Sequence, residues 1–467
     1  MKLHSLTTAF CLCILLSLPG SGRGKPNIVL IMADDMGYAG LRCTGNSAFK
    51  TPHLDALAAS GLRFTDFHSN GAVCSPTRAA LLTGRYQQRT GVDGVVNADP
   101  RVAYHHRGLQ LEELTFAEAM RGAGYATGIC GKWHVGYAPK YNPVHQGFDF
   151  FVGFVSGNID YISHYDRMET FDWWHGLELT REEGYSTHLI NRHAVEFIRK
   201  HKDEPFCLYV AHEAIHNPNQ GPDDPPLRGP NKNPKAKTSS TGEAVKAMTL
   251  AMDEGVGEIV AVLKELGIAQ ETLVVFFSDN GGTGQNKSTG PLLRGQKGSV
   301  WEGGHRVPAI ASWPGRIKPG TVTPETAMTI DLMPTMMALG GAKLPDKHRL
   351  DGIDLSALLL KNTPLPKRDL FWSLQNDRAM AARRGPWKLV VQGQKQELYN
   401  LADDLKETRD LAADHPEIAK GLRAALSRWK QDVTTGATVQ PPPPEPVLSA
   451  PRRTKKNKTR SPANPAK

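Results

Sequence analysis

The sequence has few cysteines. Only six occur in 467 residues, and Cys11 and Cys13 lie in an N-terminal apolar segment that we expect to be removed. Cys130 and Cys207 fall in apparent strands. A disulfide-stapled scaffold carries far more cysteine for its length, so that class is excluded, and we expect the remaining thiols to be buried and free.

The sequence also lacks a long hydrophobic run. The apolar run Thr7 to Leu18 follows Lys2 and His4 and precedes Pro19 and three small residues. This run is too short to span a bilayer, and its flanks are typical of a secretory signal over residues 1–22. We therefore expect an exported protein, periplasmic or secreted, with no transmembrane segment.

Net charge is scarce outside the C-terminal end. The chain carries +9, but seven basic residues and no acid lie in residues 452–467, so residues 1–451 carry only +2. We therefore expect no nucleic-acid partner, and any anion-binding patch in the body must be local. Residues 436–467 contain four consecutive prolines and this basic run, which predicts a disordered tail. The tail is either a solubilising extension or a tether to an anionic polymer or cell surface.

Continuous apolar runs indicate the fold class. Ile28–Met32, Phe206–Ala211 and Leu273–Phe277 are typical of strands buried on both faces, as in a parallel sheet. Helical spacing at Tyr185–Lys200 and Glu243–Leu266 places helices between them. The pattern predicts an α/β chain with one large domain over residues 23–345.

The composition changes after residue 345. Four short segments there predict an antiparallel sheet, and a final helix follows them: Leu370–Leu374, Met380–Arg383, Trp387–Val391, Glu397–Leu401 and then Pro416–Trp429. We expect residues 346–435 to form a smaller α+β domain.

Two of the predicted strands end in paired oxygen ligands. Asp34 and Asp35 follow the first strand, and Asp279 and Asn280 follow the strand at Leu273–Phe277. Carboxyl ends of parallel strands face the crevice where open α/β sheets bind ligands. Adjacent acids in a loop are also common turn formers. If these four residues bind a metal, their hard oxygen donors favour Ca²⁺ or Mg²⁺ over zinc.

A cysteine stands where a loop turns into a helix, in the stretch from Cys74 to Tyr86. Pro76 suits the first helical turn, and Gly84 suits the position that closes the helix. The N-terminal end of a helix carries unpaired N–H groups and favours an anion. Cys74 is therefore predicted either to lie beside an anion-binding position or to be a buried cysteine that only fills the core.

Further chemically active residues follow predicted strands. Lys132 and His134 stand two apart after a strand at Tyr125–Cys130, a spacing that suits binding an anion and moving a proton. The alternative is a solvent-facing lysine beside a capping histidine. His216 follows the strand at Phe206–Ala211, and Lys297 lies in a glycine-flanked segment.

These motifs resemble those of the sulfatase family. Cys74-x-Pro76-x-Arg78 followed by Leu-Thr-Gly-Arg is similar to its principal signature, and Gly131-Lys132-Trp133-His134 is similar to its second. The segment around Lys297 resembles its downstream lysine motif. The family commonly has Ala-Pro-His-x-Pro around the residue matching His216, and here Ile215 replaces the first proline. The resemblance covers residues 25–430 and includes arylsulfatases and N-acetylgalactosamine-6-sulfatases.

The resemblance implies a fold, a cofactor and a maturation partner. The fold would be of the alkaline phosphatase type, with a large mixed, mostly parallel sheet sandwiched by helices. A formylglycine-generating enzyme would oxidise Cys74 to formylglycine, whose hydrate is the nucleophile and completes the shell of a divalent metal, normally Ca²⁺. Conversion would leave Cys43, Cys130 and Cys207, an odd number. The metal ligands would be Asp34, Asp35, Asp279 and Asn280.

The resemblance also implies a role for each remaining site residue. Arg78 would fix the formylglycine, while Lys132 and Lys297 would bind the sulfate. His134 would take a proton from the formylglycine hydrate, and His216 or Lys297 would assist the leaving alcohol. The reaction would be hydrolysis of a sulfate ester of a saccharide or an aryl alcohol.

Two alternatives follow from the same residues. The chain could hydrolyse phosphomonoesters or phosphonate esters on this scaffold, or it could be a non-catalytic polysaccharide-binding protein in which Cys74 is never oxidised. Substrate contacts are predicted in a loop region at 145–165 and in an access loop at 217–241. The candidates are Ser156, His164, Trp173, Trp174 and His175, the last three by stacking on a sugar.

Overall fold

The computed structural model describes residues 24–233, 235–284, 293–346 and 348–444. The predicted signal, residues 1–22, and residues 445–467 of the predicted tail lie outside the described residues. In the described chain, no helix has both the length and the apolar character needed to cross a membrane. Its four cysteines, Cys43, Cys74, Cys130 and Cys207, are free thiols, and Cys130 and Cys207 are buried as predicted, whereas Cys43 is only half-buried.

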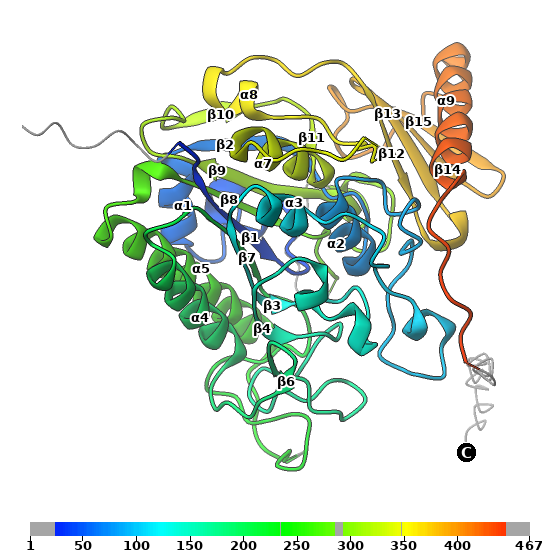
Figure 1. Cartoon of the computed structure of the whole chain (residues 1–467). Helices are drawn as coiled ribbons and strands as arrows, with labels where there is room; N and C mark the ends of the chain where they lie inside the picture. The colour runs from blue at the N-terminus through cyan, green and yellow to red at the C-terminus, as the bar shows by residue number, and fades with distance from the viewer. Residues whose placement is uncertain (1–23, 234, 285–292, 347, 445–467) are drawn as a thin grey trace, which may run out of the picture.

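A mixed sheet forms the centre of the molecule (Figure 1). Its strands in the described chain are β1 (Asn27–Ala33), β2 (Leu62–His68), β3 (Ala126–Lys132), β4 (Phe150–Phe154), β5 (Trp174–His175), β6 (Glu178–Leu179), β7 (Phe206–Ala211), β8 (Thr272–Ser278), β9 (Arg306–Ser312), β10 (Thr321–Thr323) and β11 (Ala327–Met328). They are ordered β10-β2-β9-β8-β1-β7-β3-β4-β5-β6, with β11 beside β2. The central strands β8, β1, β7, β3 and β4 are parallel, so their carboxyl ends share one edge.

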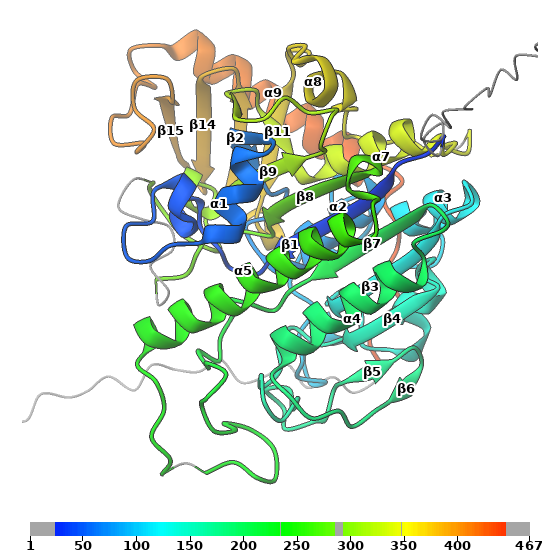
Figure 2. The same cartoon turned by 90° about the vertical axis from the view of Figure 1, so that its left-hand side faces the viewer.

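Helices cover both faces of this sheet (Figure 2). One face packs α1 (Pro52–Ala59), α4 (Ser186–Lys200) and α5 (Thr241–Glu265), and the other packs α2 (Cys74–Thr83), α3 (Phe116–Gly122) and α7 (Leu332–Gly340). The sequence of strand β1 is continuously apolar because both of its faces are covered. Ile28 and Leu30 enter the apolar cluster on the second of these faces, while Val29 and Ile31 enter the cluster on the first. A strand covered on both faces needs an apolar side chain at every position.

A smaller antiparallel sheet lies beside the large one. It consists of β12 (Asp369–Ser373), β13 (Met380–Arg384), β14 (Trp387–Gln392) and β15 (Lys395–Asn400), and α9 (Pro416–Thr434) packs on it. The short helices α6 (Glu302–His305) and α8 (Ser356–Lys361) precede it in the chain. The predicted fold, a large mostly parallel sheet between helices with a smaller antiparallel α+β unit, is confirmed.

Two local predictions are wrong. The predicted loop region at 145–165 contains strand β4, which pairs with β3. Residues 436–440 were predicted to be disordered, but the Thr438 N–H donates to the Arg89 carbonyl at 2.7 Å, and the Gly108 N–H donates to Gln440 Oε1 at 3.1 Å. Figure 1 shows this segment leaving α9 and running along the loops that follow α2. Its polar sequence has no periodicity from which such docking could be predicted.

Candidate active site

Acidic side chains lie where β1 and β8 end side by side. Ala33 of β1 pairs with Ser278 of β8, so Asp34, Asp35 and Asp279 leave the sheet at neighbouring points. The Asp35 N–H donates to Asp279 Oδ1 at 3.1 Å, and all three side chains are buried. Burial and the Asp34 charge raise the pKa of Asp279 to about 7. Carboxyl groups this close and this buried need cations around them.

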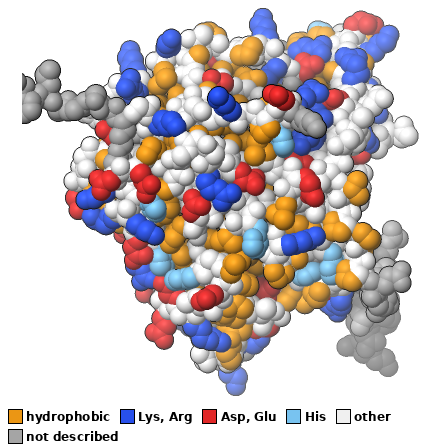
Figure 3. All heavy atoms as spheres, viewed as in Figure 1, with side chains coloured by type: hydrophobic (Ala, Val, Ile, Leu, Met, Phe, Trp, Pro, Cys, Tyr) orange, Lys and Arg blue, Asp and Glu red, His pale blue; other side chains and the backbone are white. Residues whose placement is uncertain are grey.

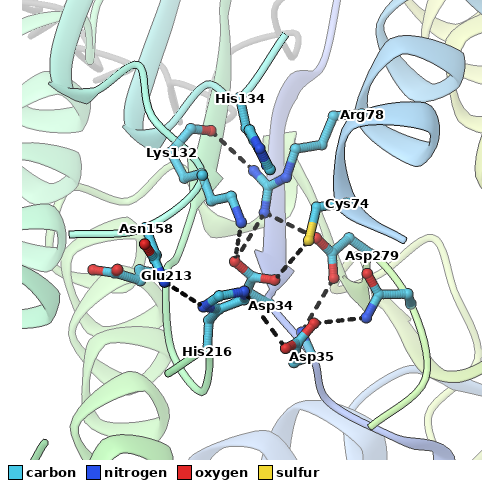
Figure 4. Close-up of polar contacts among 12 residues, drawn as sticks. Asp34, Asp35, Cys74, Arg78, Lys132, His134, Asn158, Glu213, His216 and Asp279 are labelled. Atoms are coloured by element: carbon cyan, nitrogen blue, oxygen red, sulfur yellow. Dashed lines mark hydrogen bonds and ion pairs between the residues drawn. The ribbon is translucent and has the colours of Figure 1, made fainter. Parts of the chain in front are cut away.

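Three cationic side chains contact these acids, and Figure 4 labels two of them, Arg78 and Lys132. Lys132, the last residue of β3, forms an ion pair with Asp34. Arg78 of α2 donates to Asp279 Oδ2 at 3.2 Å and to the Lys132 carbonyl at 2.9 Å. Lys297 donates to Asp35. The three cations therefore balance the three carboxylates and hold them in place, and their N–H groups are fixed in position near an anionic ligand.

Cys74 is the first residue of α2 and lies among these charges. Its thiol donates to Asp34 Oδ1 at 3.6 Å, and Lys297 Nζ donates to Sγ at 3.2 Å. The helix ends at Gly84 with a φ of 63°, as predicted. Burial and the Asp34 charge raise the pKa of the Cys74 thiol to about 12. An unmodified thiol here stays protonated at neutral pH, so it is a weak nucleophile.

His134 lies two residues beyond β3, with its ring above Arg78 in Figure 4. Its Nε2 is 3.0 Å from the Val96 carbonyl, which can only accept, so Nε2 carries the proton. Its Nδ1 is buried and has no hydrogen-bond partner in the described chain. Burial and the Lys132 charge hold the pKa of His134 well below its usual value. His134 is therefore a neutral imidazole with a bare lone pair that can accept a proton.

His216 follows β7, opposite His134. Its Nδ1 donates to the Asn217 carbonyl at 2.6 Å, and its Nε2 lies 3.7 Å from Asp35 Oδ2. Burial and the Lys297 charge lower the pKa of His216 to about 4. An anion bound beside Nε2 would raise this pKa and favour a proton there.

These residues surround a pocket of about 480 Å³. Its walls are formed by Cys74, Val95, Val96, Ala98, His134, Tyr137, Gly157, Asn158, Arg167, His216, Asn217, Arg228 and Lys297. The fully buried Arg78 and Lys132 connect to these walls through the three carboxylates. All catalytic and metal candidates predicted from the sequence thus belong to one connected cluster.

The oxygen donors predicted from the two strand ends fit a divalent cation. Asn280 Nδ2 donates to Asp35 Oδ1 at 2.8 Å, but Asn280 Oδ1 is buried with no hydrogen-bond partner among the described residues. A buried amide oxygen beside carboxylates is a donor that Ca²⁺ or Mg²⁺ accepts. Potential ligand atoms of Asp34, Asp35, Cys74 and His216 also lie within 4.8 Å of one another. The structure therefore adds His216 to the groups near this position.

Three of the substrate contacts predicted from the sequence are wrong, because Ser156, His164 and Trp173 are buried outside the pocket wall, while Trp174 and His175 are only half-buried and stay predictions. None of Ser156, His164, Trp173, Trp174 and His175 lines the pocket. The Ser156 hydroxyl donates to the Asn158 carbonyl, and the buried His164 ring stacks on Trp173 with centroids 4.7 Å apart. Trp173 is fully buried, and its Nε1 donates to a glutamate. The aromatic side chains of this segment form its own small core.

The pocket residues that were not predicted include three polar side chains, Asn158, Arg167 and Arg228. All three lie in segments with no hydrophobic periodicity, where the sequence gives no position for a side chain. The only available signal was the prediction that the loop at 217–241 shapes substrate access, since Asn217 and Arg228 both belong to it.

The pocket lies at the carboxyl edge of a mostly parallel sheet and combines cationic side chains with buried carboxylates. This arrangement is typical of a hydrolase site for an anionic ester. Residues 26–342 match the Sulfatase family model, and residues 295–432 match that of the N-sulphoglucosamine sulphohydrolase C-terminal region. The chain belongs to the sulfatase family.

Relatives agree with this assignment. Arylsulfatase A of Homo sapiens is 38% identical over 380 residues, covering 74% of this chain and 70% of that protein. N-acetylgalactosamine-6-sulfatase of Sus scrofa is 34% identical over 403 residues, covering 80% and 74%. The crystal structure of Ps i-CgsB is similar with a TM-score of 0.80 at 30% identity, covering 89% of this chain and 95% of that one. The prediction of a sulfatase enzyme is therefore confirmed.

Proposed function

We propose that this sulfatase acts through formylglycine made from Cys74, with a divalent cation, Ca²⁺ or Mg²⁺, held by Asp34, Asp35, Asp279 and Asn280. The position of Cys74 supports this most directly. It lies between Asp34 and Lys297 in the pocket, yet its thiol is too weakly acidic to attack an ester itself. Oxidation by a formylglycine-generating enzyme, and export directed by residues 1–22, belong to the same proposal.

The hydrated formylglycine would supply a hydroxyl nucleophile, and the cation would supply positive charge that activates it. Arg78, Lys132 and Lys297 offset the charge of the sulfuryl oxygens. Arg78 is held by the Lys132 carbonyl and by Asp279, so its charge needs no reorganisation during reaction. Preorganised charge of this kind is commonly the largest contribution to catalysis.

Two histidines serve the proton transfers. His134 accepts a proton at Nδ1, the ring nitrogen that lacks a partner in the described chain. His216 delivers a proton from Nε2 to the leaving oxygen. Lys297, which pairs with Asp35, is the alternative acid.

The substrate we propose is a sulfate ester of a sugar or of an aryl alcohol. The relatives named arylsulfatase A and N-acetylgalactosamine-6-sulfatase support these two classes. A phosphate ester of the same aryl alcohol provides the comparison, and a higher kcat/KM for it would favour a phosphomonoester hydrolase.

Mass spectrometry of the peptide containing residue 74 tests the proposal. In active protein this peptide should lack the thiol and should be trapped by a hydrazine. Cys74→Ala, prepared in the same way, should give neither the trapped adduct nor turnover. Full activity in protein whose Cys74 is an unmodified thiol would overturn the mechanism.

A further inference from the structure

The active-site pocket extends beyond the residues that handle the sulfate ester. Its outer wall includes Arg167, from the segment after β4, and Arg228, from the long segment between β7 and α5. Arg167 is exposed and Arg228 is half-buried. Both guanidinium groups are therefore within reach of a ligand in the pocket.

Arg228 is held next to His216 by a short series of hydrogen bonds. Arg228 Nη1 donates to Asn158 Oδ1 at 3.2 Å. Asn158 Nδ2 in turn donates to the Asn217 carbonyl at 2.7 Å and lies 3.3 Å from His216 Nδ1. A guanidinium fixed by a neutral amide keeps its full charge and has N–H groups left for a ligand. Arg167 is similarly bound to a neutral group, Asn97 Oδ1.

Neither arginine has a carboxylate within ion-pair distance in the described part of the chain, whereas Arg78, Lys132 and Lys297 each do. The acids on the Arg167 segment have other partners. Asp166 accepts from two backbone N–H groups of its own turn, and Glu169 pairs with Lys232. The outer wall of the pocket thus carries two positive charges that form no direct ion pair in the described chain, although the charge of Asp166 acts on both arginines.

We propose that Arg167 and Arg228 form a subsite for a second anionic group, a sulfate or a carboxylate, on the saccharide that carries the scissile ester. The inference rests on the proposed function, since it assigns the rest of the substrate whose sulfate is removed. It makes the substrate a polyanionic saccharide and not a neutral sugar with one sulfate. Charge-assisted hydrogen bonds of this kind favour a matching ligand by about 10- to 100-fold.

A substrate series tests the subsite. The kcat/KM is measured on a nitrophenyl sulfate and on a monosulfated neutral disaccharide. The same disaccharide is then tested with a second sulfate and, separately, with a uronate carboxylate. The two doubly charged substrates distinguish a sulfate-reading from a carboxylate-reading subsite. Wild-type enzyme should prefer one of them to the monosulfated disaccharide.

The ratio of kcat/KM for the preferred substrate to that for the monosulfated one should fall about 10- to 100-fold in Arg228→Gln and in Arg167→Gln. Arg228→Lys, which keeps one positive charge, should give an intermediate ratio. Arg181→Gln is the matched control, because Arg181 lies over Phe171 and donates to the Tyr165 hydroxyl, outside the pocket wall. Its ratio should equal that of the wild type.

The outcomes separate this inference from the proposed function. No hydrolysis of any sulfate ester by formylglycine-bearing enzyme would defeat the proposed function. Hydrolysis of the nitrophenyl sulfate with no preference for a second anion would overturn the subsite alone. An equal loss on all four substrates in the arginine variants would also overturn it, because the arginines would then serve the scissile sulfate.

Discussion

At the scale of single residues, Asp279 connects the two halves of the proposed metal site. It accepts from the Asp35 N–H and pairs with Arg78. We expect Asp279→Ala to abolish Ca²⁺ or Mg²⁺ binding and sulfate ester hydrolysis together, as measured by elemental analysis and by kinetics on the same samples. His175→Ala is the control, because it disrupts a separate cluster of His175, Glu182 and His193. Full activity of Asp279→Ala without bound metal would show that these acids only form turns.

The loss of rate on removing His216 should depend on the leaving group of the substrate. If it protonates the leaving oxygen, His216→Ala should cost little on a nitrophenyl sulfate and about 10²- to 10⁴-fold on a sugar sulfate. An acid must carry its proton, so the His216-dependent rate should fall as pH rises through its pKa in the substrate complex. That pKa lies above the value of about 4 set by burial and Lys297, because the bound anion raises it. Equal losses on both substrates, with no change in the pH profile, would assign the acid to Lys297.

His212 is buried at the end of β7, and neither ring nitrogen has a hydrogen-bond partner in the described chain. Burial lowers its pKa from 6.5 to about 3. Between pH 6.5 and pH 3 only the unfolded chain binds a proton at His212. The stability that the neutral His212 preserves is therefore complete above pH 6.5 and is lost as the pH falls toward 3. The loss is on the order of 4 kcal/mol.

We expect His212→Leu to reduce this acid sensitivity, measured as the free energy of unfolding in urea at several pH values. At neutral pH the variant should be about as stable as the wild type, because it removes unsatisfied polar atoms. A parallel pH dependence in the two proteins would contradict a proton-free His212.

The site was predictable where a residue adjoins a strand or helix end within a motif. Cys74, Lys132 and Asp279 are of this kind, since the element that precedes or follows each one fixes its position. Arg167 and Arg228 were not predictable, because long segments without periodicity bring them to the pocket.

At the scale of elements, Gly131 shows how strand pairing positions Lys132. Its φ is 111°, and a Cβ there would lie 2.0 Å from the Ala211 carbonyl oxygen of β7. Gly131→Ala should therefore destabilise the protein by at least about 3 kcal/mol and impair catalysis, because β3 must move away from β7. Unfolding in urea and kinetics measure the two effects.

The control for this prediction is Gly122→Ala. Gly122 ends α3, and a Cβ added there would meet no other described part of the protein within 4 Å. Alanine there should be neutral or stabilise the helix by up to about 1 kcal/mol. Wild-type stability and activity in Gly131→Ala would mean that the β3–β7 pairing does not position Lys132.

The sequence predicted helices and strands correctly where every residue on the packed side of the element is buried. Strands β1, β7 and β8 are covered on both faces, so their apolar runs identify them, and the heavily apolar face of α5 does the same. Strand β4 was missed because its residues, Phe150–Phe154, adjoin aromatic loop residues with the same composition. Only its pairing with β3, which is not local in the sequence, distinguishes it as a strand.

At the scale of the whole molecule, buried ion pairs join the smaller sheet to the large sheet and to the helix α6 that precedes it. Arg383 of β13 pairs with Asp66 of β2 at 2.6 Å, and Lys388 of β14 pairs with Glu302 of α6 at 2.8 Å. All four side chains are buried. Separating the sheets would break these pairs and expose the apolar cluster around Trp372, so the smaller sheet is a fixed part of the catalytic body.

The surface of that body shows no large field of one sign on the face in Figure 3, where basic and acidic side chains are interspersed. This agrees with the net charge of only +2 over residues 1–451. Attraction of a polyanionic substrate would therefore depend on the local pocket charges and on the basic residues 452–467.

The docked segment around Thr438 and Gln440 leads to different predictions for truncations on either side of it. These residues bind the loop at 89–110, through contacts with the backbone of Arg89 and Gly108. The same loop carries Val96, whose carbonyl holds His134. A chain ending at residue 444 should therefore keep its melting temperature and its rate on an aryl sulfate.

A chain ending at residue 436 should melt at a lower temperature and lose aryl sulfate turnover, because the loop that orients His134 loses its support. Thermal unfolding and kinetics on both truncations measure this, and Gln440→Ala in the full chain should shift stability in the same direction by about 1 kcal/mol. Equal behaviour of the two truncations would mean that the docked segment does not support the site. A loss confined to polymeric substrates in the chain ending at 444 would instead identify residues 445–467 as a tether for an anionic polymer.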